Sequence, residues 1–167
     1  MATAGNNLSS YEKGDLPNGA HYQVGIVVSE WNRKYTQGML DGALQVLHEA
    51  GVQAEAIHLH WVPGSYELPL GAQWLAAKDF IDGVICIGSV IRGETAHFDY
   101  VCSSAASGIL KVGQDSGKPA MFCVLTDDTA EQAEARSGGQ HGNKGIEAAV
   151  GLLKMLSLRD TLNSSTS

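Results

Sequence analysis

Residues 83–98 read GVICIGSVIRGETAHF and combine an apolar run, a glycine-bounded loop and the start of a helix. The run from Gly83 to Gly88 is nearly all apolar, which is typical of a short strand covered on both faces of a sheet. The helical segment that follows spans residues 98–114. A buried strand that leads through such a loop into a helix predicts one unit of a parallel α/β sheet.

The same alternation of strand and helix extends in both directions from this unit. Residues 33–50 carry apolar side chains at helical spacing, and Gly51 suits the left-handed conformation that ends many helices. We expect strands at residues 22–29, 54–62, 83–88 and 119–125, and helices at 33–50, 67–78, 98–114, 129–136 and 144–156. This order predicts a three-layer α/β/α sandwich with a four-stranded parallel sheet at its centre.

Length and composition fit one folded domain with short extensions. The chain has 167 residues, of which 44% are hydrophobic and 17% are charged, as in a well-packed globular domain. Residues 1–20 are rich in Gly, Asn and Ser and predict a flexible N-terminal arm. We expect residues 21–158 to form the folded domain and residues 159–167 a flexible tail.

Charge and cysteine content narrow the class of protein. A formal net charge of -7 argues against binding to nucleic acid or to an anionic membrane, because both need basic surface. Residues 1–20 lack the features of a signal peptide, and no apolar run is long enough to span a membrane. Cys86 and Cys123 lie in apolar runs without zinc-site spacing, so we expect buried free thiols in a reducing cytoplasm, and no metal site.

The first strand exit offers an aromatic ring and an amide. In open α/β sheets, ligands bind beyond the carboxyl ends of the strands. Trp31 follows the first expected strand and suits stacking on a planar heterocycle, while the Asn32 amide suits pairing with its edge. The alternative is a packing tryptophan and an asparagine that caps the next helix.

The second exit is a rigid turn between Pro63 and Pro69. It carries Ser65, Tyr66 and Glu67, and the backbone amides at the helix start that follows are free to bind a ligand. Glu67 is a partner for a ring rich in N–H groups. The alternative is a turn with no binding role, in which Glu67 only complements the helix dipole.

The third exit contains the strongest signal for chemistry. A loop bounded by glycines that leads into a helix start is an anion site, and Thr95 adds a hydroxyl donor. His97 stands at the helix start, where it can transfer a proton near neutral pH. A purely structural histidine is the alternative. The loop lacks the Gly-x4-Gly-Lys-Ser/Thr pattern of nucleotide triphosphatases, which argues against that class.

The fourth exit is mainly a helix cap, and two cations follow it. Arg136 ends one expected helix and Lys144 begins the next, across a glycine-rich link. In a chain this acidic, both are candidates for holding phosphate, with a solvated turn as the alternative. His58 and His60 share a strand face but have no third ligand nearby, so we expect packing or solvent-facing roles.

Taken together, these exits resemble the lumazine synthase family from about Tyr22 to Leu156. The specific motif is Gly-x-Val-Ile-Arg-Gly-Glu-Thr-x-His-Phe-x-Tyr-Val at residues 88–101, supported by residues 62–67, 124–126 and 142–145. The resemblance implies a flavodoxin-like sheet and no cofactor. It also implies condensation of 5-amino-6-(D-ribitylamino)uracil with 3,4-dihydroxy-2-butanone 4-phosphate, which gives 6,7-dimethyl-8-ribityllumazine in the penultimate step of riboflavin biosynthesis.

The resemblance also assigns roles to individual residues, with His97 as the proton donor. Contacts to the ribitylaminouracil fall on Trp31, Asn32, Ser65, Tyr66, Glu67, Ser89, Val90, Ile91, Phe122 and Lys144. Contacts to the sugar phosphate fall on Gly93, Glu94, Thr95 and Arg136. Phe122 matches a ring contributed across a subunit boundary, although its place within a strand predicts a core residue.

Assembly is implied in the same way. The resemblance points to small-molecule substrates, a homopentamer with shared active sites, and a functional link to riboflavin synthase. The compact link at residues 138–144 favours a 60-subunit icosahedral shell over a free pentamer, and the arm would cover the sheet edge of a neighbour. Two other readings stay open: a flavodoxin-like protein that only binds a flavin, and a shell protein whose pockets are blocked.

Overall fold

A parallel sheet forms the centre of the protein. The computed structural model describes residue 7 and residues 9–164. In this part of the chain four strands pair in the order β2-β1-β3-β4, all parallel. Their bounds are β1 (Val24–Ser29), β2 (Ile57–Val62), β3 (Gly83–Ile91) and β4 (Ala120–Asp127).

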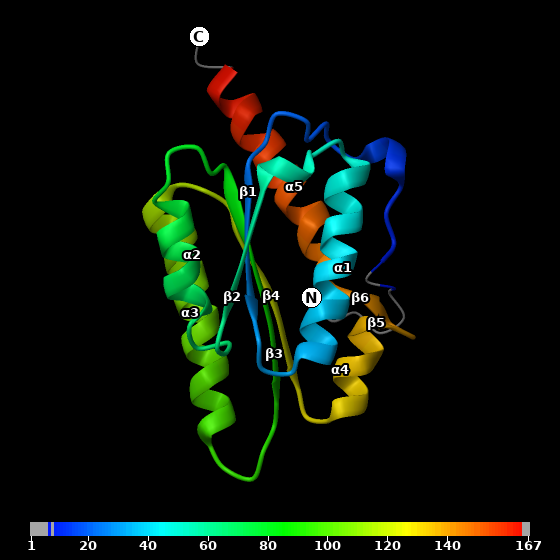
Figure 1. Ribbon diagram of the computed structural model, residues 1–167, viewed down its shortest axis with the longest axis vertical. Coiled ribbons are helices and arrows are strands. Elements are labelled where there is room, and N and C mark those ends of the chain that lie inside the picture. Colours follow the sequence, from blue (N-terminus) through cyan, green and yellow to red (C-terminus); the bar gives the residue numbers. More distant parts are fainter. Residues whose placement is uncertain (1–6, 8, 165–167) are drawn as a thin grey trace.

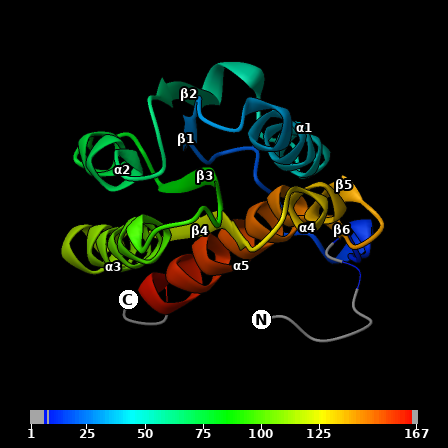
Figure 2. The same cartoon turned by 90° about the horizontal axis from the view of Figure 1, so that it is seen from below.

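Helices cover both faces of this sheet, as Figures 1 and 2 show. One face carries α2 (Leu68–Ala76) and α3 (His97–Ser116). The other carries α1 (Arg33–Glu49), α4 (Ala130–Arg136) and α5 (Lys144–Ser164). Short pieces complete the described chain: the 3-10 turns Lys13–Asp15 and Ala54–Ala56 and the small hairpin of β5 (Ser137–Gly139) and β6 (Gly142–Asn143). The predicted three-layer sandwich is confirmed.

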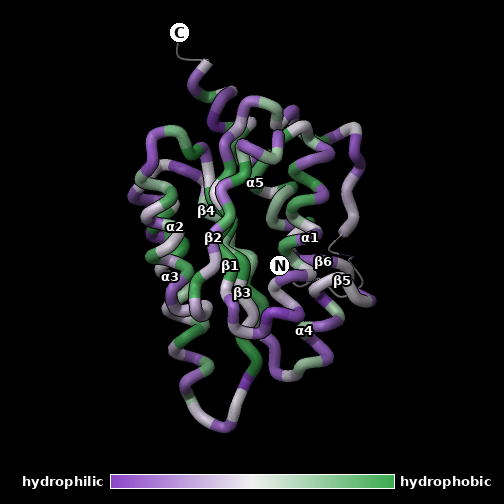
Figure 3. The backbone as a smooth tube through the Cα atoms, viewed as in Figure 1, coloured by the Kyte–Doolittle hydropathy of each residue, from purple (hydrophilic) through white to green (hydrophobic). Residues whose placement is uncertain are grey.

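The core has two parts, one on each side of the sheet. All six residues of β1 are buried, since helices cover both faces. On the α1 and α5 side, Met39 and Leu152 are among the fully buried side chains, and on the α2 and α3 side Leu68 and Ile109. Figure 3 shows the hydrophobic residues gathered along the strands and the inner faces of the helices.

Several element bounds differ from the sequence expectation. β3 continues to Ile91, beyond the expected end at residue 88, because its ladder with β4 extends to the pair Ile91 and Asp127. Residues 54–56 form a 3-10 turn and not the start of a strand. As expected, Gly51, which follows α1, has a left-handed φ of 92°, and Pro69 lies in the first turn of α2.

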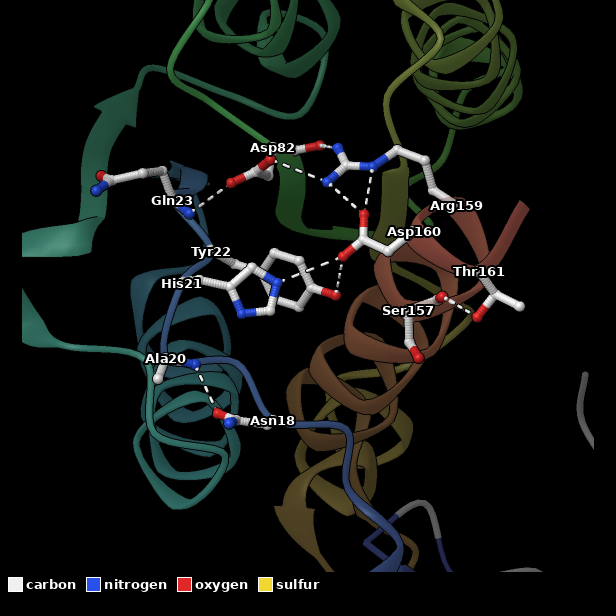
Figure 4. A network of polar contacts seen from close by, with 10 residues as sticks. All are labelled: Asn18, Ala20, His21, Tyr22, Gln23, Asp82, Ser157, Arg159, Asp160 and Thr161. Atoms are coloured by element: carbon white, nitrogen blue, oxygen red, sulfur yellow. Dashed lines mark hydrogen bonds and ion pairs between the residues drawn. The ribbon is translucent and has the colours of Figure 1, made fainter. Parts of the chain in front are cut away.

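The prediction of a tail from residue 159 was wrong for the described residues. Helix α5 continues to Ser164 because polar contacts tie its last turns to the sheet. Arg159 Nη2 lies 3.0 Å from Asp82 Oδ1, and the Tyr22 hydroxyl donates to Asp160 Oδ2 at 2.8 Å (Figure 4). Residues 165–167 lie outside the described residues.

The N-terminal arm lies against its own chain where the structure describes it. The Tyr11 hydroxyl donates to Glu49 Oε2 at 3.0 Å, and the backbone N–H of Asn143 donates to Ser9 Oγ at 3.0 Å. These contacts place the arm beside α1 and β6. Residues 1–6 and 8, which also belong to the predicted arm, lie outside the described residues. Within the described part, no helix is both long and apolar enough to cross a membrane.

Candidate active site

A cavity of about 560 Å³ opens at the carboxyl ends of β1 and β3, beside the starts of α2 and α3. It brings together residues from three of the four strand exits. Predicted site residues that line it are Trp31, Asn32, Ser65, Tyr66, Glu67, Ser89, Val90, Ile91, Gly93, Thr95 and His97. Gly64, Phe98 and Val101 also line it and were not predicted. His97 and Val101 are four residues apart on α3, so the helical period was the signal that could have found Val101.

Trp31 and Asn32 form the wall at the end of β1. The Trp31 side chain is 73% exposed. Asn32 has a φ of 59°, the left-handed region that few residues other than glycine adopt. Its side chain makes no cap hydrogen bond; Nδ2 donates instead to the carbonyl oxygen of Ser89 at 2.9 Å. The capping alternative was therefore wrong, and Asn32 joins the exits of β1 and β3.

Two buried hydroxyls belong to residues that line the cavity. Ser65 is 5% exposed and Ser89 is 1% exposed, and neither Oγ has a hydrogen-bond partner in the described structure. A Cβ at Gly88 would lie 2.6 Å from Ser65 Oγ, so only glycine permits this approach. Because a buried hydroxyl without a partner is costly, both groups suit the polar atoms of a ligand.

The loop between β3 and α3 forms the opposite wall. Gly93, Thr95 and His97 line the cavity, and His97 is the exposed first residue of α3. Its backbone N–H donates to Thr95 Oγ1 at 3.4 Å. The free amides at the start of this long helix favour an anion. Glu94 belongs to the same exposed loop but does not line the cavity.

Arg92 in this loop had no role in the sequence analysis. Its side chain bonds Asp128 and Asp99 and lies over the Phe98 ring. It is therefore turned away from the cavity, although both of its neighbours in the chain, Ile91 and Gly93, line it.

Three further predicted residues lie outside the cavity lining: Phe122, Arg136 and Lys144. Phe122 is 38% exposed because β4 is an edge strand, so the expectation of a core residue was wrong. The Lys144 ammonium pairs with the Glu147 carboxylate. The described residues that line the cavity include no lysine and no arginine.

Arg136 lies beside a buried carboxylate at the end of β4. Its Nη1 is 3.9 Å from Asp127 Oδ1 and donates to the carbonyl oxygen of Gln132 at 3.0 Å. Asp127 is 7% exposed, and burial raises the pKa of its carboxyl group while Arg136 opposes that rise. The Thr129 hydroxyl accepts from the backbone N–H of Gln132, which confirms the predicted cap of α4.

The cysteines take no part in the cavity. Cys86 and Cys123 are buried free thiols, as predicted, and burial raises the pKa of Cys123 to about 12. In the described residues, no group of three or more His, Cys, Asp or Glu side chains is arranged to hold a metal ion.

Comparison with known proteins gives a consistent result. The family model described as 6,7-dimethyl-8-ribityllumazine synthase matches residues 21–160. Proteins of that name from Cytophaga hutchinsonii and Christiangramia forsetii are 51% and 48% identical to this chain. The first match covers 93% of this chain and 98% of the relative, and the second covers 95% of each. A third relative of that name, from Porphyromonas gingivalis, is 47% identical over 95% of this chain and 98% of its own. This chain therefore belongs to the 6,7-dimethyl-8-ribityllumazine synthase family.

Proposed function

We propose that the protein is a transferase of riboflavin biosynthesis that makes 6,7-dimethyl-8-ribityllumazine. Its substrates are 5-amino-6-(D-ribitylamino)uracil and 3,4-dihydroxy-2-butanone 4-phosphate. The observation that carries the proposal is the composition of one cavity. The same cavity is lined by an exposed tryptophan, two serines whose buried hydroxyls have no partner, and a histidine at a helix start.

The half of the cavity near β1 suits the uracil. Trp31 stacks on the pyrimidine ring in this proposal, because an exposed indole presents a flat apolar face. Asn32, Ser65, Tyr66 and Glu67 offer hydrogen bonds to the ring edge and the ribityl chain. The segment from Ser89 to Ile91 supplies backbone groups and apolar surface on the same side.

The loop before α3 suits the sugar phosphate. Gly93, Glu94 and Thr95 supply backbone amides and a hydroxyl for the phosphate, next to a helix start that favours negative charge. His97 lines the same cavity, and in this proposal it exchanges protons with the reacting groups.

The reaction needs proton transfer and placement of two molecules. The amine of the uracil attacks the ketone and water leaves, which gives an imine. Elimination then releases inorganic phosphate, and ring closure with loss of a second water gives the lumazine. No lysine is needed for the imine because the substrate brings its own amine. Holding both reactants in one cavity can supply roughly 7–11 kcal/mol in favourable cases.

The cavity of one chain is incomplete for this reaction in one respect. A phosphate ester calls for a permanent cation, and the described lining residues include no lysine and no arginine. We infer that Phe122, Arg136 and Lys144, on β4, α4 and α5, act in the cavity of a neighbouring subunit of a homopentamer. The exposed Phe122 ring on the edge strand supports this inference. A 60-subunit shell of such pentamers and a functional link to riboflavin synthase belong to the same proposal.

The direct test mixes the purified protein with both substrates and follows the absorbance of the lumazine. The proposal expects product to form much faster than in the same mixture without protein, and only when both substrates are present. A chain that binds riboflavin but leaves the uncatalysed rate unchanged would be a flavin-binding module. An assembled but inactive particle would support a structural role.

A further inference from the structure

We propose that Arg92 is a positioning residue that holds the phosphate-binding loop and His97 in their working arrangement. The inference rests on the proposed function, since it concerns the loop assigned to the sugar phosphate. It gives Arg92 a role that is separate from phosphate binding itself.

The Arg92 guanidinium touches three points of the structure at once. Its Nε donates to Asp128 Oδ1 at 2.7 Å, at the exit of β4. Its Nη1 donates to Asp99 Oδ1 at 3.2 Å, in the first turn of α3. Its Cζ lies 4.1 Å from the centre of the Phe98 ring, and that ring lines the cavity. One side chain therefore connects β4 with the start of α3.

The backbone of Arg92 is held as well. Its N–H donates to the carbonyl oxygen of Asp127 at 2.9 Å, which extends the pairing of β3 and β4 by one bond. The loop that begins here returns to the same guanidinium at Asp99, two residues after His97. Arg92 thus ties the two ends of the loop to each other and to the sheet.

The loop itself has little packing to hold it. Residues 92–97 are all exposed, and a Cβ placed on Gly93 would meet no other atom within 4 Å. Single exposed ion pairs stabilise proteins weakly. A planar guanidinium that bonds two carboxylates and covers an aromatic ring restrains its partners in a way that a lysine cannot reproduce.

The direction in which the Arg92 side chain points indicates that it positions the loop and does not bind the phosphate itself. Ile91, Gly93, Thr95 and His97 line the cavity, whereas the Arg92 side chain points to two carboxylates that balance its charge. As a positioning residue, it acts on the geometry of the loop. Loss of the Arg92 side chain should therefore weaken binding of the sugar phosphate and leave the uracil contacts at β1 and α2 intact.

The test is steady-state kinetics with each substrate varied in turn, together with calorimetric binding of inorganic phosphate. Arg92→Gln should raise KM for the sugar phosphate on the order of tenfold, which is less than the hundredfold that a misplacement of about 1 Å can cost. KM for the uracil should stay within about twofold, because its contacts are unchanged. Arg92→Lys should recover part of the loss, since it keeps the charge without the fork.

Two further variants make the test specific. Lys111→Gln breaks the 2.7 Å ion pair between Lys111 and Asp115. Both residues are exposed on the same helix, away from the cavity, so this variant should change neither KM. Asp99→Asn releases one side of the Arg92 guanidinium. A positioning residue predicts weaker phosphate binding in Asp99→Asn, whereas a direct phosphate ligand would bind phosphate as well or better once released.

The experiment tests the role of Arg92 even if the protein does not catalyse the proposed reaction. If the wild type makes no lumazine, the proposed function fails, and the Kd for inorganic phosphate alone still compares the variants. An unchanged Kd and KM in Arg92→Gln would overturn the positioning role. An equal rise of both KM values with a lower unfolding midpoint would also overturn it, because that pattern marks general destabilisation.

Discussion

Trp31 leaves most of its indole exposed at the end of β1, although burial of an indole is normally favourable. The same holds for Tyr66, which is 63% exposed and lines the same cavity. In contrast, Ser65 and Ser89 are buried without partners. Exposed aromatic rings together with buried polar groups suit a ligand that is flat and carries polar groups at its edge.

Stacking on Trp31 predicts an optical signal. Riboflavin or a lumazine should quench the fluorescence of the wild type when it binds, and Trp31→Phe should lose the greater part of that quenching. Fluorescence titration measures it. Trp61, with the Arg33 guanidinium 4.4 Å from its ring centre, and the exposed Trp74 give the background. Quenching that survives in full in Trp31→Phe would move the ring-binding site elsewhere.

The role of His97 predicts a rate effect without a stability effect. His97→Ala should lower kcat by about 10² to 10⁴-fold if proton transfer limits the rate. The free energy of unfolding should change little, because the side chain is exposed at the helix start. Rate measurements need correction for the uncatalysed condensation. Full activity under saturating substrates would remove His97 from the mechanism.

Sequence reasoning located most of the candidate site because the carboxyl ends of parallel strands meet at one edge of a sheet. Trp31, Ser65 and His97 are far apart in the chain and line one cavity for that reason. Phe122 was different. Its exposure depends on β4 being the edge strand, and strand order is a long-range property that local pattern does not report.

At the scale of elements, α5 is longer than its apolar pattern predicts. Leu158 and Leu162 beyond the expected end are exposed, so burial does not drive these last turns. They are held by a polar cluster that joins Arg159 and Asp160 to Asp82 and Tyr22 (Figure 4). Such partners lie far apart in sequence, which explains why periodicity alone ended the helix early.

This cluster predicts a measurable contribution to stability. Tyr22 is 2% exposed and donates to a carboxylate, so Tyr22→Phe should lower the free energy of unfolding by about 1–2 kcal/mol at pH 7. Denaturant unfolding measures it. His21→Ala is the matched control, because its 3.4 Å contact with the same Asp160 is exposed and should matter little.

The same bond predicts a dependence on pH. Burial, followed by the bond to Asp160, raises the pKa of Tyr22 from 10.0 to about 12. Its contribution to stability is therefore complete below pH 10 and is lost as the pH rises towards 12. The Tyr22→Phe protein should lack this loss. Parallel stability curves for both proteins between these pH values would contradict the assignment.

At the scale of the whole molecule, the α2 and α3 side carries several large apolar side chains that are exposed. Trp74 is 65% exposed and Leu110 is 62% exposed, and Leu70, Phe80 and Tyr100 are exposed as well. Large exposed apolar patches mark contact surfaces between proteins. The surface therefore agrees with the proposed homopentamer.

If the site is shared between subunits, two inactive variants should complement each other. His97→Ala and Arg136→Ala remove residues that, in the proposal, serve one cavity from adjacent subunits. When equal amounts are unfolded and refolded together, about a quarter of the interfaces should carry both native residues, and activity should return to a similar fraction. Mixed proteins that stay inactive, while refolded wild type regains activity, would place both residues in one chain.

Light scattering tests the assembly itself. A mass near five times 17.6 kDa indicates a free pentamer, and a mass twelve times larger indicates the shell. A mass near that of one chain would rule out both. The mass should also be measured at several phosphate concentrations, because a bound anion would link neighbouring subunits in the proposed site.

Figure 1 shows Ser164, the last residue of α5, at the end of the sheet opposite to the carboxyl ends of the strands, where the cavity opens. A second protein attached at residue 164 through a flexible linker would leave the chain at a point far from the candidate site. A reporter attached at residue 164 would therefore leave the candidate site open to its substrates.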